Sequence, residues 1–171
     1  MKIQNYKKGF TLIEILIYIA VLTMIILAVL SFLIWAIKSH NKVGAMLEVS
    51  DSGYRVMEII THEIRGAKSV YTPTSSITQL SLETLRSLSP GEETGYVDFY
   101  LCEGVTLCLK QESGDSIALT PDNIEVSRLE FIQIATSSVQ IDLEINHKNP
   151  QNRPEYQASI NLISTVSLRP N

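Results

Sequence analysis

Glu14 is the residue with the clearest chemical role, because it is the only charged side chain between Thr11 and Ile37. Its neighbours are apolar. A carboxylate in a bilayer-length apolar helix costs about 2.5 to 3.5 kcal/mol near the centre of a span and less toward its ends. Such a group needs a partner of opposite charge. Phe10 lies four residues earlier, on the same helical face, so a positive charge there would be well placed.

Cys102 and Cys108 are the only cysteines, and they are candidates for a disulfide if this part of the chain enters an oxidising compartment. A two-residue turn at 103–104 would hold the two sulfurs too far apart to bond. A five-residue loop at 103–107 would instead set Cys102 opposite Cys108. The sequence leaves both alternatives open.

No other group of side chains predicts catalysis or ligand binding. The three histidines have no zinc-like spacing near either cysteine, and Asp142 with Glu144 fits the solvated face of a strand better than an acid/base pair. The chain has no glycine-rich phosphate loop and no nucleophile elbow. We therefore expect a protein that is not an enzyme, with no cofactor and no metal site.

The element that must position Glu14 is an apolar run from Ile15 to Ile37. As a helix it would span about 34 Å, enough to cross the hydrocarbon core of a bilayer. Lysines flank it unevenly, with three before it and two soon after it: Lys2, Lys7, Lys8, Lys38 and Lys42. The positive-inside tendency predicts a cytoplasmic amino terminus and an exported remainder. A secretory signal would have a shorter apolar stretch followed by a small-residue cleavage site.

The apolar run is preceded by Lys7-Lys8-Gly9-Phe10-Thr11-Leu12-Ile13-Glu14. This segment resembles the recognition sequence of type IV prepilins and type II secretion pseudopilins, whose pattern is K-G-F-T-L-x-E. The resemblance implies that residues 1–9 are a leader, cut between Gly9 and Phe10 by prepilin peptidase, which also methylates the new amine of Phe10. Many major pilins have a proline where this chain has Ser31, which weakens any assignment as the main fibre subunit.

Cleavage would create an ammonium group on Phe10, about 6 Å along the helix from Glu14. At an effective dielectric near 20, opposite charges about 4 Å apart gain about 4 kcal/mol, comparable with the cost of the carboxylate in lipid. Two pairings are open. Glu14 meets the Phe10 amine of its own chain, or, as the resemblance favours, that of a neighbouring subunit during assembly.

Beyond the apolar run the helix is expected to continue to about Ala67, with its end near Gly66. Apolar residues recur there at steps of three, four or seven: Val43, Met46, Leu47, Tyr54, Met57, Ile60, Ile64 and Ala67. We expect four segments: the leader (1–9), a transmembrane and assembly helix (10–37), its amphipathic continuation (38–69) and an exported domain (70–171).

In the exported domain, apolar and polar residues alternate with a period of two. Val139, Ile141, Leu143 and Ile145 alternate with polar residues, which predicts a half-buried strand. The segment 156–168 reads similarly, and the polar stretch 149–154 joins the two as a hairpin. Five further strands are expected: 77–82, 96–102, 106–111, 116–119 and 124–134. The predicted fold class is α+β, a long helix packed through its amphipathic half on an antiparallel sheet, as in pilins.

Charge argues against one class of partner. Without the three leader lysines, 11 basic residues face 18 acidic ones, a net charge of about −7. A subunit that gripped DNA would show a basic stripe with interleaved aromatics, so nucleic acid is a disfavoured partner.

The expected function is a structural minor pilin or pseudopilin, anchored in the inner (cytoplasmic) membrane and then assembled. The segment 163–169, with helix residues such as Arg55 and Arg65, resembles minor pilins and J-type minor pseudopilins. Glu14 argues against the K-type tip subunit, which typically lacks that glutamate. The implied partners are prepilin peptidase, other subunits, the inner-membrane assembly platform and lipid. The alternatives are a membrane-tethered binding module or adhesin with a pilin-type leader, and an exported enzyme.

Overall fold

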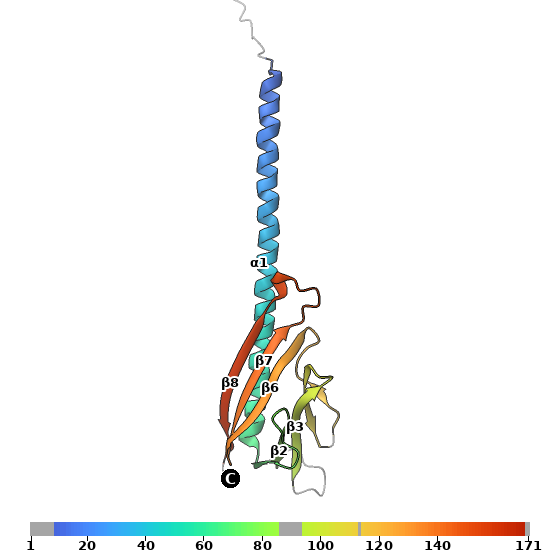
Figure 1. The fold of residues 1–171 in the computed structure, drawn as a ribbon, viewed down its shortest axis with the longest axis vertical. Coiled ribbons are helices and arrows are strands. Elements are labelled where there is room, and N and C mark those ends of the chain that lie inside the picture. Colours follow the sequence, from blue (N-terminus) through green and yellow to red (C-terminus); the bar gives the residue numbers. More distant parts are fainter. Residues whose placement is uncertain (1–8, 86–93, 113, 170–171) are drawn as a thin grey trace, which may run out of the picture. The chain divides into compact units, whose positions relative to one another are not determined.

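The computed structural model describes residues 9–85, 94–112 and 114–169 (Figure 1). The chain divides into two compact units, one that ends at His40 and one that begins at Asn41. Helix α1 extends from Leu12 to Gly66 without interruption, which confirms the prediction of one long helix. Neither Ser31 nor Gly44 breaks it.

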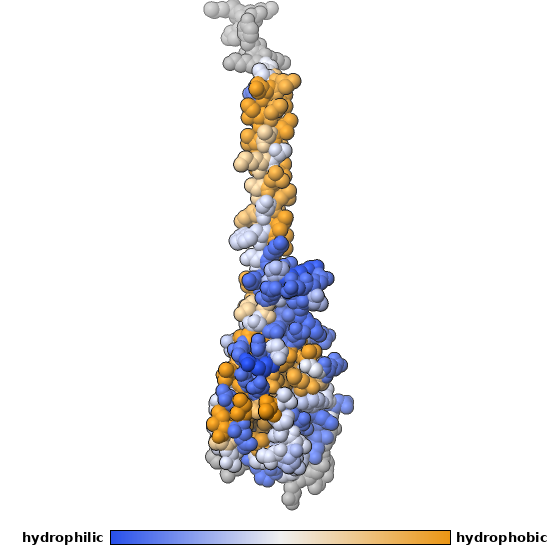
Figure 2. Space-filling view, viewed as in Figure 1, coloured by the Kyte–Doolittle hydropathy of each residue, from blue (hydrophilic) through white to orange (hydrophobic). Residues whose placement is uncertain are grey.

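In the first unit, α1 is a bare apolar helix. The large apolar side chains from Leu12 to Ile37 are about half exposed or more, and Figure 2 shows their continuous apolar surface. The Thr23 hydroxyl donates to the Ala20 carbonyl and the Ser31 hydroxyl to the Leu27 carbonyl, each at 2.9 Å. These hydroxyls are therefore satisfied within the helix. By length and composition this helix could cross a membrane.

The second unit contains two antiparallel sheets in place of the single sheet that was predicted. A five-stranded sheet has the order β1 (Ser69–Val70), β2 (Leu80–Thr84), β3 (Gly95–Cys102), β4 (Thr106–Gln111) and β5 (Ile117–Ala118). A three-stranded sheet has the order β6 (Ile124–Ala135), β7 (Ser138–His147) and β8 (Ser159–Ser167). The predicted hairpin is confirmed as the antiparallel pair β7 and β8, whose connection includes the short 3-10 helix Pro154–Tyr156.

The core lies between the three-stranded sheet and the second half of α1. The alternation predicted for β7 is confirmed, since Val139, Ile141, Leu143 and Ile145 are all at most 1% exposed. Opposite them on α1, Val49, Val56, Ile60 and Ile64 are completely buried. Gly53 marks the closest approach, because a Cβ there would lie 3.1 Å from Ile145 Cδ1 and Leu162 Cδ1. This packing fixes the face of α1 that the sheet covers.

The predicted buried face of α1 is partly wrong. Val43, Met46, Leu47 and Tyr54 are 45–65% exposed, although Ile60, Ile64 and Ala67 are buried as predicted. The helix buries smaller side chains there: Ala45, Val49, Ser52 and Gly53. Small residues let the sheet approach the helix closely, so the larger apolar residues lie to one side of the contact.

The five-stranded sheet joins the same core through main-chain and side-chain contacts. The N–H of Phe131 in β6 donates to the Ile77 carbonyl at 2.7 Å, and the N–H of Val126 donates to the Val105 carbonyl at 2.8 Å. Arg55 on α1 donates to the Leu119 carbonyl at 3.1 Å. Both sheets therefore belong to one unit with one continuous cluster of buried side chains.

Candidate assembly site at the start of the helix

Gly9 and Phe10 lie just before Thr11, the residue that precedes α1, and both are exposed. Of the predicted leader, residues 1–8 lie outside the described residues. A Cβ built on Gly9 would meet nothing within 4 Å, so the fold itself does not demand glycine at this position. The Phe10 side chain is 70% exposed. The predicted cleavage point is therefore accessible on both sides of the Gly9–Phe10 bond.

Thr11 caps the helix just after this point. Its side-chain oxygen accepts the Glu14 N–H at 3.4 Å, and its carbonyl accepts the N–H groups of Glu14 and Ile15 at 3.1 and 3.3 Å. The sequence Thr-x-x-Glu is a capping-box pattern, in which the carboxylate would reach back to the first residue. Glu14 occupies the first turn, where the helix dipole favours a negative charge.

The Glu14 carboxylate accepts a hydrogen bond from Tyr18, a residue that was not identified from the sequence. The Tyr18 hydroxyl donates to Glu14 Oε1 at 3.1 Å. The Tyr18 ring also meets the Phe10 ring edge to face, with centroids 6.3 Å apart and an angle of 73° between planes. The signal that could have revealed it is the spacing, since Phe10, Glu14 and Tyr18 are four residues apart on one helical face.

Among the described contacts, no hydrogen bond joins Phe10 to Glu14, and none reaches Glu14 Oε2. The chain here is uncut, so the Phe10 nitrogen is a peptide N–H without charge. The site thus holds a half-buried carboxylate with one oxygen bound by Tyr18. A carboxylate accepts several hydrogen bonds, so the second oxygen can take a further donor.

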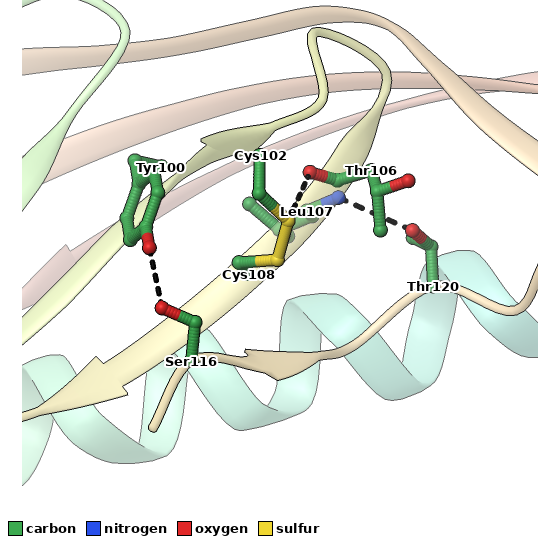
Figure 3. Close-up of a disulfide and its surroundings, with 7 residues drawn as sticks. All are labelled: Tyr100, Cys102, Thr106, Leu107, Cys108, Ser116 and Thr120. Atoms are coloured by element: carbon green, nitrogen blue, oxygen red, sulfur yellow. Dashed lines mark hydrogen bonds between the residues drawn. A yellow bond between two sulfur atoms is a disulfide. The ribbon is translucent and has the colours of Figure 1, made fainter. Parts of the chain in front are cut away.

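The structure joins Cys102 and Cys108 by a disulfide, with Cα atoms 5.8 Å apart (Figure 3). Both predicted loops are wrong, because β3 and β4 are linked by three residues, 103–105, and Cys102 pairs with Thr106. Glu103 and Gly104 adopt positive φ there. The bond joins diagonal positions of the hairpin. Nearby, the Leu107 N–H donates to Thr120 Oγ1 at 3.2 Å, and the Tyr100 and Ser116 hydroxyls lie 2.5 Å apart.

Glu83 in β2 is a second polar centre, outside the apolar helix. Hydrogen bonds from Lys68 Nζ and Ser69 Oγ, each at 2.7 Å, lower the pKa of Glu83 below its ordinary value. Ser69 and Glu83 are cross-strand partners in β1 and β2. The centre ties the residues after α1 to the five-stranded sheet, which is a structural role. Among the described residues, no three His, Cys, Asp or Glu side chains gather as a metal site would require.

Comparison with known proteins is informative for the first part of the chain. Residues 4–31 match the family model described as the prokaryotic N-terminal methylation motif. That range contains Gly9, Phe10, Glu14 and Tyr18. The match supports the pilin and pseudopilin class, a class of structural subunits, and implies processing by prepilin peptidase and assembly with other pilin subunits. With the long apolar helix it supports a membrane-anchored protein. Neither a curated protein nor a solved structure matches the chain.

Proposed function

We propose that this protein is a minor subunit of a type IV pilus or a type II secretion pseudopilus. The chain is anchored in the inner membrane with its C-terminal part exported, cut between Gly9 and Phe10, methylated at Phe10 and then drawn into a fibre. One observation carries the proposal. Glu14 is the only charge in the apolar part of α1, and it lies five residues after Gly9 inside the segment that matches the methylation motif.

In this proposal Glu14 recognises the Phe10 amine of a neighbouring subunit. Tyr18 occupies Oε1 and orients the carboxylate, while Oε2 takes the incoming ammonium group. A hydrogen bond to the charged carboxylate also compensates part of its desolvation while the subunit waits alone in lipid. The pair fixes the register of one helix against the next, because apolar packing alone would tolerate sliding.

The remaining segments support this role. Residues 10–37 supply the assembly helix, whose apolar surface contacts lipid before assembly and other helices afterwards, with the inner-membrane assembly platform as the expected partner. Residues 38–69 carry the exported domain of residues 70–171. The minor role, similar to J-type subunits, is favoured by Ser31 in place of the common proline and by a glutamate that K-type tip subunits typically lack.

The experiment compares Glu14→Val with Glu58→Val, an exposed glutamate on the same helix. Each variant is expressed with the fibre system, and the leader state and the fraction of chain in sheared fibres are measured. We expect Glu14→Val to insert and lose its leader normally but to be absent from fibres, whereas Glu58→Val assembles. Gly9→Val provides the uncut reference, since the fold leaves open space at that position.

Normal assembly of Glu14→Val would refute the role of the carboxylate. A chain that keeps its leader, or that works without any fibre, would favour a membrane-tethered binding module. These outcomes are distinguishable because leader removal and fibre incorporation are read separately.

A further inference from the structure

Strand β8 is an edge strand, and its outer edge is open. It is the last strand of the sheet β6-β7-β8, and it pairs with β7 over nine positions without a bulge. Its sequence, Ser-Ile-Asn-Leu-Ile-Ser-Thr-Val-Ser, has no charge and no proline. Proteins usually protect such edges with lysine, proline, a bulge or a covering segment, because a regular open edge pairs with other strands.

The register shows which main-chain groups point outward. Flanking the paired strands, the His147 N–H donates to the Ala158 carbonyl at 2.9 Å and the Leu168 N–H to the Ser137 carbonyl at 2.7 Å. Alternate residues of an antiparallel strand share this direction, so even-numbered residues of β8 bond to β7. Asn161, Ile163 and Thr165 therefore direct their N–H and C=O groups away from the sheet. No described residue bonds to these groups.

The opposite edge of the same sheet, formed by β6, makes bonds to other segments of the chain. Along β6, the N–H groups of Val126 and Phe131 donate to the carbonyls of Val105 and Ile77. The pairing of β6 with β7 also contains two irregularities, near Val126 and near Gln133. Among the described residues, the β6 edge is thus bonded to other segments and irregular, whereas the β8 edge is regular and makes no such bonds; β8 lies at the margin of the sheet in Figure 1.

The side chains beside the open edge are apolar on the inner face. Ile160 and Leu162 of β8 are half-buried, and a Cβ built on Gly53 of α1 would lie 3.3 Å from Ile160 Cγ2 and 3.1 Å from Leu162 Cδ1. Met46 and Met57 lie seven residues before and four after Gly53, so they share its side of the helix. Met46 is 45% exposed. A strand added to β8 would place alternate side chains over this apolar flank.

On the outer face, acidic residues of β6 and β7 lie in cross-strand register with β8. Ile163 pairs with Asp142, which pairs with Glu130 in β6, and the next row brings in Glu144. Arg128 is the cation of these rows, 3.4 Å from Asp142 Oδ1 and 3.6 Å from Glu144 Oε2. Asp142 and Glu144 thus share one guanidinium, and Glu130 adds a third carboxylate to these rows. A second copy paired here would add more carboxylates, while a basic strand would complement them.

We propose that the open edge of β8 binds an extended strand of another exported polypeptide, one that alternates apolar residues with lysine or arginine. Its main chain bonds to Asn161, Ile163 and Thr165, and its apolar side chains cover Ile160, Leu162 and Met46. Its basic side chains extend across the outer face of β8 toward the carboxylates of β7. This is strand addition, in which main-chain bonds supply affinity and alternate side chains supply specificity. The inference concerns the second unit and does not depend on leader removal or on Glu14.

The test uses the full chain in detergent and three labelled nine-residue peptides, matched in length to β8. One alternates lysine with valine, one alternates glutamate with valine, and one has the lysine–valine composition in scrambled order. We expect the alternating basic peptide to bind at least about tenfold more tightly than either control, because only this peptide combines the strand pattern with a charge opposite to that of the carboxylates. Hydrogen exchange should slow at the amides of Asn161, Ile163 and Thr165.

Two variants at one position separate main-chain binding from side-chain binding. Ile163→Pro removes an outward N–H while keeping the bonds to β7, whereas Ile163→Ser keeps the N–H and removes the exposed side chain. We expect the proline variant to lose at least about tenfold in affinity and the serine variant to change by less than about threefold. Hydrogen exchange on the unchanged chain decides the question if the proline variant fails to fold.

Equal binding of the scrambled or acidic peptide, or unchanged exchange at these three amides, would overturn the proposal. Self-association of the free chain that Ile163→Pro abolishes would also overturn it, by showing that a second copy occupies the edge.

Discussion

The two units of this chain differ in the exposure of their apolar side chains, which are largely buried in the second unit and exposed in the first. In the second unit, α1 and the sheet bury one another, and residues such as Ile60 and Leu143 are fully inaccessible. In the first unit, the large apolar side chains from Leu12 to Ile37 are about half exposed or more. The first unit therefore presents an apolar surface that lipid or other helices could cover, and in the proposed function its single carboxylate makes the contact with other helices specific.

The largest difference is expected from matched core truncations. Leu143→Ala should lower the free energy of unfolding of the second unit by about 2–5 kcal/mol, because it leaves a cavity in a close-packed core. Leu30→Ala, at a side chain 50% exposed in the first unit, should leave that free energy unchanged. Denaturant unfolding followed by near-ultraviolet circular dichroism measures both. Equal losses would show that the units are not energetically separate.

Tyr18→Phe should impair fibre assembly without changing the stability of the second unit. The variant keeps the ring that contacts Phe10 but loses the hydroxyl bond to Glu14, a kind of bond worth about 1.5–3 kcal/mol. We expect a reduced fraction of chain in fibres, a smaller loss than for Glu14→Val, and no change in unfolding of the second unit. Tyr54→Phe, on the exposed side of α1, is the control. Full assembly of Tyr18→Phe would remove Tyr18 from the site.

Two glycines of α1 sharpen the comparison within one helix. Gly53→Val should cost about 1–3 kcal/mol of unfolding free energy, because even its Cβ would lie 3.1–3.3 Å from three side chains of the sheet. Gly44→Val, with nothing within 4 Å, should cost nothing. Thermal unfolding of the two variants checks this. A loss at Gly44 as large as at Gly53 would contradict the described packing.

The smallest effect is expected at Glu83, and it depends on pH. Because its pKa is lower in the folded state, its stabilising contribution is present above the unfolded value near 4.5 and is lost as the pH falls through the folded value. Glu83→Gln should therefore be less stable than the natural chain at pH 7 and equal to it at strongly acidic pH. Unfolding titrations across this range, with Glu58→Gln as control, measure the difference. A constant gap at all pH values would refute the assignment.

The succession of the main elements along the chain could be predicted from sequence, because the signal for each element lies within the element itself. The apolar run, the helix end at Gly66 and the alternation in β7 each reflect one element, and all three predictions are confirmed. The buried face of α1 was predicted less well, since large apolar residues suggested burial for Leu47 and Tyr54. The actual contact selects small residues such as Gly53, and this depends on how closely a distant strand approaches.

The division into two sheets and the Cys102 hairpin could not be read from sequence for a related reason. β1 and β5 have two residues each, too few to show a period. The three-residue turn depends on Glu103 in a positive-φ conformation, which is uncommon for a residue other than glycine. At the candidate site, Gly9, Phe10 and Glu14 were predicted from the resemblance of residues 7–14 to the prepilin recognition sequence. The sequence did not reveal the direction of the Glu14 carboxylate, and Tyr18 was therefore missed.

The most direct test of the proposed function is the mass of the N-terminal peptide of the chain purified from membranes. We expect a peptide that begins at Phe10 with a methylated amine and retains Glu14, the two groups proposed to pair between subunits. A peptide that begins at Met1, or a cut after the apolar run, would contradict it.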